Sequence, residues 1–390
     1  MAQNYQKIGD YISVLDNRNA DGSITNLMGI SIDKCYIPSV ANVIGTDLNN
    51  YKVIRKGQFA CSLMQVSRDQ RIPLAMYTSD EPAIMSPAYV MFEVNRPDVL
   101  LPEYMELWFK RAEFDREASF YAVGGVRGSL DWEDFCKMKL PVPSIFEQRK
   151  IVHDYQVITD RIELLLKMNE SLEEQEDVIF QVRYSKKSWR DGRFFELIVG
   201  NIPGDWGSDT IKGNKNSQVT CIRGADIPGL TVGMTMDAPI RYIMEKNYLS
   251  KSLPANSMII EMSGGSPTQS TGRIALLTDV IRTKLNHRVI CSNFCRAITV
   301  KREYLYFFYL AWRHLYKINR LFDYENSTIG LKNFDYQSFI TQEVIKIPTV
   351  EEGRRLNELI EPIHNAIITN GSEIEMLKRL QTVILPTIMR

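Results

Sequence analysis

A seven-residue repeat of aliphatic side chains occurs twice in this 390-residue chain, at a constant distance of 205 positions. Such a repeat places one apolar stripe along an α-helix, and a helix of this kind buries its stripe against another helix. Because neither stripe has another obvious partner, we expect the two helices to pack on each other. The stripes comprise Ile151, Ile158, Leu165, Leu172 and Ile179 in the first copy, and Leu356, Ile363, Asn370, Leu377 and Ile384 in the second.

The second stripe contains one polar residue, Asn370, which would face Leu165 or its neighbours. A single buried asparagine at such a position fixes the register of two helices at some cost in stability. Pro362 is expected to kink the second helix, because proline removes a backbone donor, and Gly371 is expected to loosen it.

A short motif precedes each repeat, PVPSIFEQRKI at residues 141–151 and PTVEEGRRL at residues 348–356. Ser144 and Glu147 have the three-residue spacing of a capping box, in which each side chain accepts a hydrogen bond from the other residue's backbone N–H. The first helix is therefore expected to begin near Ile145.

The segments upstream of the two motifs also correspond. EYMELWFKRAEF (103–114) and EYLYFFYLAWRHL (303–315) are predicted amphipathic helices, and KGQFACSL and ANSMIIEMS are predicted strands. We therefore predict an α+β protein in which two globular domains of mixed helices and strands alternate with two long helices. The predicted boundaries are 1–140 for the first domain, 141–185 for its helix, 186–346 for the second domain and 347–390 for its helix.

The sequence favours a non-catalytic protein. It lacks a P-loop, a dinucleotide-binding glycine motif between a strand and a helix, and the Asn/Asp-Pro-Pro-aromatic tetrapeptide of amino-methyltransferases. Cys291 and Cys295 are interpreted as core thiols, not as zinc ligands. His153 and His364 lie on the long helices, where a solvated position is expected. The six scattered cysteines and the absence of a membrane-length apolar run indicate a cytoplasmic protein without a membrane partner.

Polar loops occur at matched places in the two halves, Gln65–Arg71 and Gly264–Arg273. Arginine recognises guanine, glutamine and asparagine recognise adenine, and hydroxyl and amide groups bind phosphates, so this composition suits DNA recognition. Ordinary solvent loops share the composition, and the net charge of zero decides nothing. The candidate DNA-binding residues are Arg68, Gln70, Arg71, Arg127 and Ser129 in the first domain, and Ser266, Gln269, Thr271, Arg273, Lys332 and Asn333 in the second.

The motif formed by Pro143, Glu147, Gln148, Arg149 and Ile151 at the start of a heptad helix resembles the helical region of type I restriction–modification specificity subunits. The second copy departs from it, with Gly353 where the first has Gln148. The resemblance covers essentially the whole chain. It implies two target recognition domains, each of which reads one half of a split double-stranded DNA sequence. It also implies a pseudo-twofold repeat with the helices paired as an antiparallel coiled coil that sets the spacer.

The same resemblance implies that catalysis belongs to partners. Two methyltransferase (modification) subunits would bind the helices and domains and hold S-adenosylmethionine, and a restriction–translocation subunit would complete the full enzyme. This chain itself would bind no cofactor and no metal.

Two other interpretations remain open. The chain is also compatible with the specificity subunit of a stand-alone methyltransferase or of a type IIB-like enzyme that cuts beside its site. A non-DNA coiled-coil scaffold with two protein-binding domains would explain the helices, but it would not explain the paired polar loops.

Overall fold

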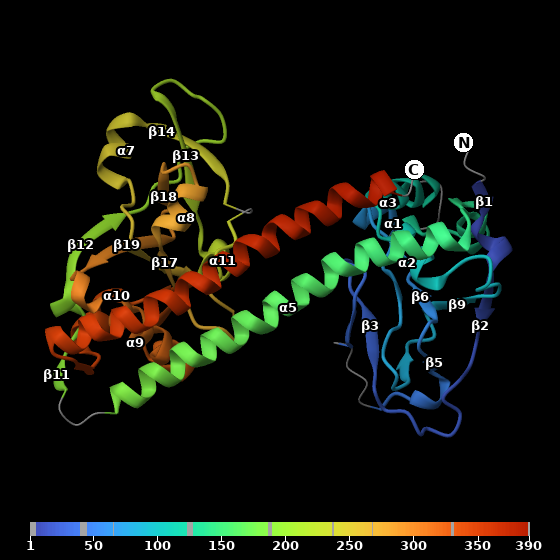
Figure 1. The fold of residues 1–390 in the computed structure, drawn as a ribbon, viewed down its shortest axis with the longest axis horizontal. Coiled ribbons are helices and arrows are strands. Elements are labelled where there is room, and N and C mark those ends of the chain that lie inside the picture. The colour runs from blue at the N-terminus through green and yellow to red at the C-terminus, as the bar shows by residue number, and fades with distance from the viewer. Residues whose placement is uncertain are drawn as a thin grey trace. The chain divides into compact units, whose positions relative to one another are not determined.

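The computed structural model describes residues 5–39, 45–64, 66–122, 128–185, 189–235, 238–266, 268–328 and 331–388 (Figure 1). The chain groups into two compact units, residues 1–160 with 379–390 and residues 161–378. Two long helices, α5 (Ile145–Tyr184) and α11 (Val350–Ile388), contribute to both units. The mixture of helices and strands confirms the α+β class, whereas the predicted domain boundaries stay a prediction because each unit includes parts of both helices.

The first globular domain is built on a four-stranded antiparallel sheet with the order β2-β9-β6-β7. Phe59 and Phe92 stack across this sheet at 5.1 Å, and Phe109 and Phe135 pack against them in a dry aromatic core. Its strands are β1 (Tyr5–Lys7), β2 (Ile12–Leu15), β3 (Met28–Ile30), β4 (Tyr36–Pro38), β5 (Lys52–Ile54), β6 (Phe59–Cys61), β7 (Leu74–Met76), β8 (Ala83–Met85), β9 (Val90–Val94) and β10 (Lys139–Pro141). Its helices before α5 are α1 (Val66–Asp69), α2 (Pro102–Phe109), α3 (Ala112–Tyr121) and α4 (Trp132–Lys137).

The second globular domain has its main sheet in the order β12-β19-β15-β17, again antiparallel. Trp312 lies at the centre of its aromatic core and donates from its indole N–H to the Gly272 carbonyl at 2.8 Å. Its strands are β11 (Arg190–Gly192), β12 (Ile198–Pro203), β13 (Lys215–Ile222), β14 (Ile240–Met244), β15 (Ser257–Glu261), β16 (Ser263–Gly264), β17 (Ile274–Leu277), β18 (Val289–Cys291), β19 (Cys295–Val300), β20 (Glu325–Thr328), β21 (Leu331–Phe334) and β22 (Ile345–Ile347). Its helices before α11 are α6 (Ile227–Thr231), α7 (Glu245–Lys251), α8 (Asp279–Lys284), α9 (Leu305–Lys317) and α10 (Tyr336–Gln342).

The two domains repeat one topology, as the duplicated sequence predicts. In each main sheet the strands come in the same relative order, and a further two-stranded pair, β1-β10 or β11-β22, joins the start of the domain to the strand before the long helix. The predicted strands KGQFACSL and ANSMIIEMS form β6 and β15, and the two aromatic helices form α2 and α9. The predicted core thiols Cys291 and Cys295 are buried.

Both long helices begin with the expected capping geometry. The Ser144 backbone N–H and hydroxyl donate to the Glu147 carboxylate at 3.0 and 2.8 Å, and the Glu147 N–H donates to the Ser144 hydroxyl. These hydrogen bonds lower the pKa of Glu147. Thr349 and Glu352 repeat the arrangement at the start of α11.

The one departure between the two motifs has a physical reason. Gln148 is fully buried and ties α5 to the first domain, because its amide accepts from the Leu101 N–H and donates to the Val99 carbonyl, both at 2.8 Å. At Gly353 a Cβ atom would lie 2.5 Å from the Glu303 carbonyl oxygen, so no side chain fits. Asn357, one turn later, instead ties α11 to the second domain. Its side-chain amide accepts a hydrogen bond from the Tyr306 N–H and donates one to the Arg302 carbonyl.

Contacts between α5 and α11 run in opposite chain directions, so the helices pair antiparallel. Asn370 donates to Asn169 at 2.9 Å, and Asn169 donates to the Ile367 carbonyl at 3.2 Å. On one side of this pair, Arg161 forms a bidentate ion pair with Glu373. The heptad residues are not equally buried: Ile158, Leu165 and Leu356 are buried, whereas Ile151, Leu172, Ile179, Ile363, Asn370, Leu377 and Ile384 are half-buried.

Helix α11 continues without interruption past Pro362 and Gly371. Gly371 permits a close backbone contact, because a Cβ atom there would lie 1.5 Å from the Val232 carbonyl oxygen. Gly233 makes the reciprocal contact: it has a φ of +80°, and its Cβ would lie 2.8 Å from the Ile368 Cα. These glycines let α11 and the loop after α6 touch through backbone atoms.

A buried charge network joins α5, α9 and α11 in the second unit. Arg313 donates to Glu176 at 2.8 Å and to Glu173 at 3.0 Å, while His364 Nδ1 lies 3.0 Å from Glu176. The expectation that His364 is solvated is wrong: the residue is 1% exposed, and the rings of Tyr306 and Tyr309 pack against its imidazole. His153 is exposed as expected.

Replacing Glu176 by alanine is expected to lower the free energy of unfolding by about 3 kcal/mol, because Arg313 would stay buried without one of its carboxylate partners. Denaturant titration followed by circular dichroism measures the change. Glu174→Ala, at an exposed position of the same helix, is the matched control. Equal stability of the two variants would show that the network contributes nothing.

Candidate nucleic-acid interface

Three of the predicted residues of the first domain lie together at α1. The segment Gln65–Arg71 is not an extended loop, because its centre forms α1, and Gln70 ends the helix with a φ of +55°. Arg68 is exposed and forms a bidentate pair with Asp69, at 2.7 and 3.1 Å. Arg71 donates to Asp33 at 2.8 Å. Ser129 is half-buried, and Arg127 lies outside the described residues.

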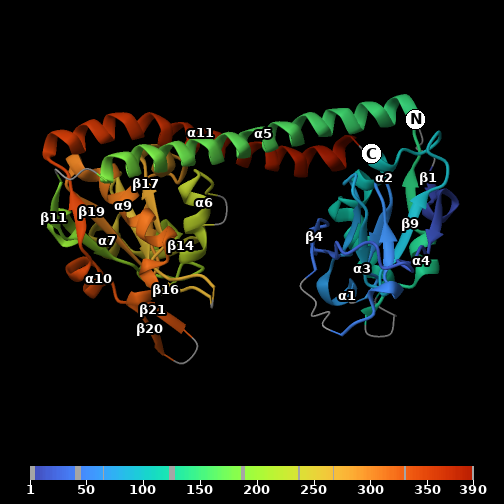
Figure 2. The ribbon, with the colours of Figure 1, turned by 90° about the horizontal axis from the view of Figure 1, so that it is seen from below.

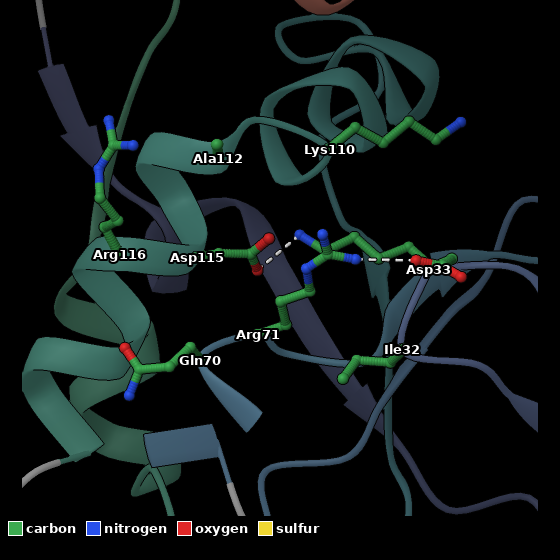
Figure 3. A pocket seen from close by; sticks show the side chains of 9 residues that line it. Ile32, Asp33, Gln70, Arg71, Lys110, Ala112, Asp115 and Arg116 are labelled. Atoms are coloured by element: carbon green, nitrogen blue, oxygen red, sulfur yellow. Dashed lines mark hydrogen bonds and ion pairs between the residues drawn. The ribbon is translucent and has the colours of Figure 1, made fainter. Parts of the chain in front are cut away.

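A pocket of about 330 Å³ separates this segment from α3 (Figure 3). At its base, Lys34 is buried, lies 2.8 Å from Asp115 Oδ1 and donates to the Phe109 carbonyl. Burial lowers the pKa of Lys34, and the Asp115 carboxylate opposes that shift. Figure 3 shows the Arg71 guanidinium paired with Asp33, and it shows Arg116 pointing away from the Asp115 carboxylate. The pocket thus combines cations with the carboxylates that hold them in place.

Two predicted residues of the second domain, Lys332 and Asn333, lie in one small sheet. Strand β16 pairs with β21, and β21 pairs with β20, so that Ser263 faces Asn333 and Gly264 faces Lys332. The Ser263 hydroxyl donates to the Asn333 side chain at 2.6 Å. In Figure 2 these strands lie on the side of the second domain away from α5 and α11. We call this three-stranded sheet the β-finger.

Two of the predicted residues are held by carboxylates inside the domain. Arg273 donates to Glu261 through two hydrogen bonds of 2.8 and 2.6 Å, which raise the pKa of the guanidinium. Thr271 is fully buried, and its N–H and hydroxyl both donate to Glu325. The structure thus gives Arg273 and Thr271 internal partners, and their proposed contact with DNA stays a prediction.

The remaining candidates of the second domain reach solvent. Gln269 is exposed, and Ser266 is half-buried and faces it across an isolated β-bridge. Lys332 is partly exposed, pairs with Glu325 at 2.9 Å and lies over the Phe322 ring. Their contact with DNA also stays a prediction.

The sequence reasoning missed the acidic partners and the basic residues beside them. Asp33 lies far from Arg71 in the sequence, Asp115 lies far from Lys34, and Glu325 lies far from Thr271, so no local pattern links these pairs. Lys34 and Arg116 were missed because each stands alone among ordinary polar residues. Only the fold brings these groups to one place.

The described residues show neither a cluster of metal-ligating side chains nor a membrane-spanning helix. They contain no group of three or more histidine, cysteine or acidic side chains placed to hold a metal ion. Among the same residues, no helix combines the length and the apolar character that crossing a membrane requires.

Comparison with known proteins found similarity to one group. No family model matches the sequence. A curated relative, the specificity subunit of the type I restriction enzyme MjaIX from Methanocaldococcus jannaschii, is 23% identical over 310 residues, which are 75% of this chain and 69% of the relative. The crystal structure of a type I restriction–modification S subunit from M. genitalium aligns with a TM-score of 0.58 and 11% identity, over 100% of this chain and 97% of that chain. That likeness shows a shared fold.

Glu325→Ala is expected to loosen the β-finger, because the variant removes the acceptor of Thr271 and the partner of Lys332. Loss of a buried charged acceptor costs about 1–3 kcal/mol, so amide exchange in β20, β21 and residues 268–272 should accelerate roughly tenfold or more. Hydrogen–deuterium exchange with mass spectrometry measures this. Asn326→Ala, at an exposed neighbouring position, is the control, and unchanged exchange in the Glu325 variant would contradict the assignment.

Proposed function

We propose that this chain is a specificity subunit of a type I restriction–modification enzyme and that it recognises a bipartite DNA sequence, a proposal supported by its similarity to such a subunit. Each globular domain reads one half of the target, the first through the region around α1 and the second through the β-finger. The observation that carries the proposal is the repeated topology, in which one scaffold occurs twice and bears a polar element in each copy, with Arg and Gln around α1 and with Ser, Asn and Lys in the β-finger.

The position of these elements within each domain supports the proposal. Figure 2 shows α1 and α3 on the side of the first domain away from α5, and the β-finger on the side of the second domain away from the long helices. The long helices are therefore free to bind other subunits while the opposite side of each domain binds DNA.

Catalysis is proposed to reside in partner subunits. The sequence lacks the phosphate-binding, dinucleotide-binding and amino-methyltransferase motifs that an enzyme of this class would need. Two modification subunits would bind S-adenosylmethionine and transfer its methyl group to the bases that this chain selects. A restriction–translocation subunit would join them in the full enzyme.

The outer side of α5 is the proposed docking surface for one modification subunit. In the second unit its exposed residues include Leu164, Met168, Val178 and Val182, which recur at helical spacing. Residues 161–184 carry six carboxylates and three basic side chains, so DNA is disfavoured and a protein is favoured there. Val383 of α11 is also exposed, and it lies 205 positions after Val178, so the repeat offers a second docking place.

The helix pair is proposed to set the distance between the half-sites. A paired helix is stiff, and α5 has 40 residues, which corresponds to a length of about 60 Å. The Asn169–Asn370 pair and the Arg161–Glu373 pair fix one register between α5 and α11. A single register gives a single spacer length.

Methylation mapping of genomic DNA from cells that express this chain with its modification subunits tests the function. A methylated split sequence with a constant spacer is the expected result. Methylation without a split sequence, or assembly without any DNA specificity, would support the scaffold interpretation instead. Cleavage assays on mapped sites then separate a full restriction enzyme from a stand-alone methyltransferase.

Inserting one heptad into α5 after Arg161 and one into α11 before Glu373 is expected to lengthen the spacer and to leave both half-sites unchanged. Seven helical residues add about 10 Å, which equals up to about three base pairs of DNA. Methylation mapping measures the new spacer. The heptad inserted in α5 alone is the control, because it breaks the register and should abolish activity. An unchanged spacer in the double insertion would refute the role of the helices.

Leu164→Glu combined with Met168→Glu is expected to weaken the binding of a modification subunit at least roughly tenfold, because two apolar contacts become buried charges. Size-exclusion chromatography with light scattering reports the stoichiometry of the complex. Leu249→Glu, which changes a still more exposed leucine on α7, is the control. Full assembly of the double variant would exclude this surface.

A further inference from the structure

The solvent side of α3 carries a stripe to which no role has been assigned. Ala112, Arg116 and Phe120 follow at intervals of four residues and are all exposed, whereas Phe114 and Ala118 on the other side are buried in the core. Phe120 is 77% exposed, and the ring of Tyr121 lies 5.9 Å from it in an edge-on arrangement. A pair of large exposed aromatic rings at a helix end marks a contact surface.

We propose that this stripe binds duplex DNA in the first half-site, with Arg116 on a backbone phosphate and Phe120 as an apolar wedge at a base step. The proposal rests on the proposed function and extends it, because it assigns α3 and its aromatic end to the interface. Exposed apolar side chains flanked by arginines are used by DNA-bending proteins to part adjacent bases. We call Arg116, Phe120 and Tyr121 the α3 face.

Two arginines beside the α3 aromatic end project into solvent, where a phosphate can reach them. Arg116 is 71% exposed while its partner Glu113 is 41% exposed, and Arg68 is 66% exposed while Asp69 is 25% exposed. Here the cation projects further into solvent than the carboxylate that orients it. Exposed ion pairs of this kind are weak, so a phosphate can replace the carboxylate at little cost.

The other ion pairs around the α3 face differ from one another. Lys110 is 32% exposed against 17% for Glu106, which follows the same pattern. In the pairs Arg71–Asp33, Arg111–Glu113 and Lys34–Asp115 the carboxylate is the more exposed partner, and for Arg71 the values are 52% against 75%. Asp33 therefore holds Arg71 at the surface, where its orientation suits recognition of one base edge more than a general phosphate contact.

The position of α3 agrees with this assignment. It adjoins the pocket that contains Lys34 and Arg71, and Arg116 points away from the Asp115 carboxylate (Figure 3). Within the first domain, α3 lies on the side away from α5 (Figure 2), so the proposed docking of a modification subunit on that helix would leave it accessible.

The test measures binding of the complex with modification subunits to a duplex that carries the mapped target. Phe120→Ala is expected to weaken binding about tenfold or more, because stacking on a base contributes about 1–3 kcal/mol. The variant should also abolish the fluorescence increase of 2-aminopurine placed in the first half-site, which reports unstacking. Phe120→Trp should retain both signals. Arg116→Ala should reduce the slope of log affinity against log salt by about 0.9, the value for one phosphate contact.

Matched controls lie outside both the α3 face and α5. Phe195, between β11 and β12, is 50% exposed, and Lys56 is 60% exposed with Asp80 as its carboxylate partner, so Phe195→Ala and Lys56→Ala should leave DNA binding unchanged. Wild-type affinity and 2-aminopurine signal in Phe120→Ala would overturn the α3 proposal and leave the proposed function intact. Loss of subunit assembly with unchanged DNA affinity would overturn it too, because the α3 face would then bind protein. A wild-type complex without specific binding would overturn both.

Discussion

The antiparallel packing of α5 against α11 is the interaction on which the rest of the structure depends. Each domain takes side chains of the helix pair into its own core: Leu385 packs in the first, and Phe180, Leu356 and Ile360 pack in the second. Polar groups within the pair then restrict how it can assemble. The Asn169–Asn370 hydrogen bond and the Glu176–Arg313–His364 network are satisfied in one register, and a shifted register would leave buried polar groups without partners.

The duplication explains how one chain can hold two globular domains that share a sheet topology but differ in their peripheral elements. The four-stranded sheets share one strand order because their buried faces must fit the same kind of helix packing. Elements outside the sheets are not under that constraint, so the first domain has α1 and α3 where the second has the β-finger. This separation between a shared core and variable polar elements suits the proposed reading of two unrelated half-sites.

The sequence predicted the long helices, their starting points and the repeat, because these follow from local periodicity and capping. It also led to the group of proteins to which the chain is similar. It failed at His364, since a histidine outside the main stripe still becomes buried when a third helix, α9, covers it. Asn169 was missed for a similar reason, as it lies one turn after Leu165 and gains its role only from Asn370. The carboxylates Asp33, Glu261 and Glu325, which hold candidate DNA-binding residues, come from distant segments that only the fold brings together.

The backbone contact at Gly371 constrains which domains and helices recombination can exchange between such proteins. Val232 belongs to the second globular domain and Gly371 to the helix that follows it, and no side chain fits between them. A recombination event that brought in a foreign domain but kept this helix would succeed only if the incoming loop could pack its backbone against Gly371. The reverse exchange would need a glycine at that turn of the incoming helix. New specificities would therefore arise most readily when a domain and the middle of its helix are inherited as one segment.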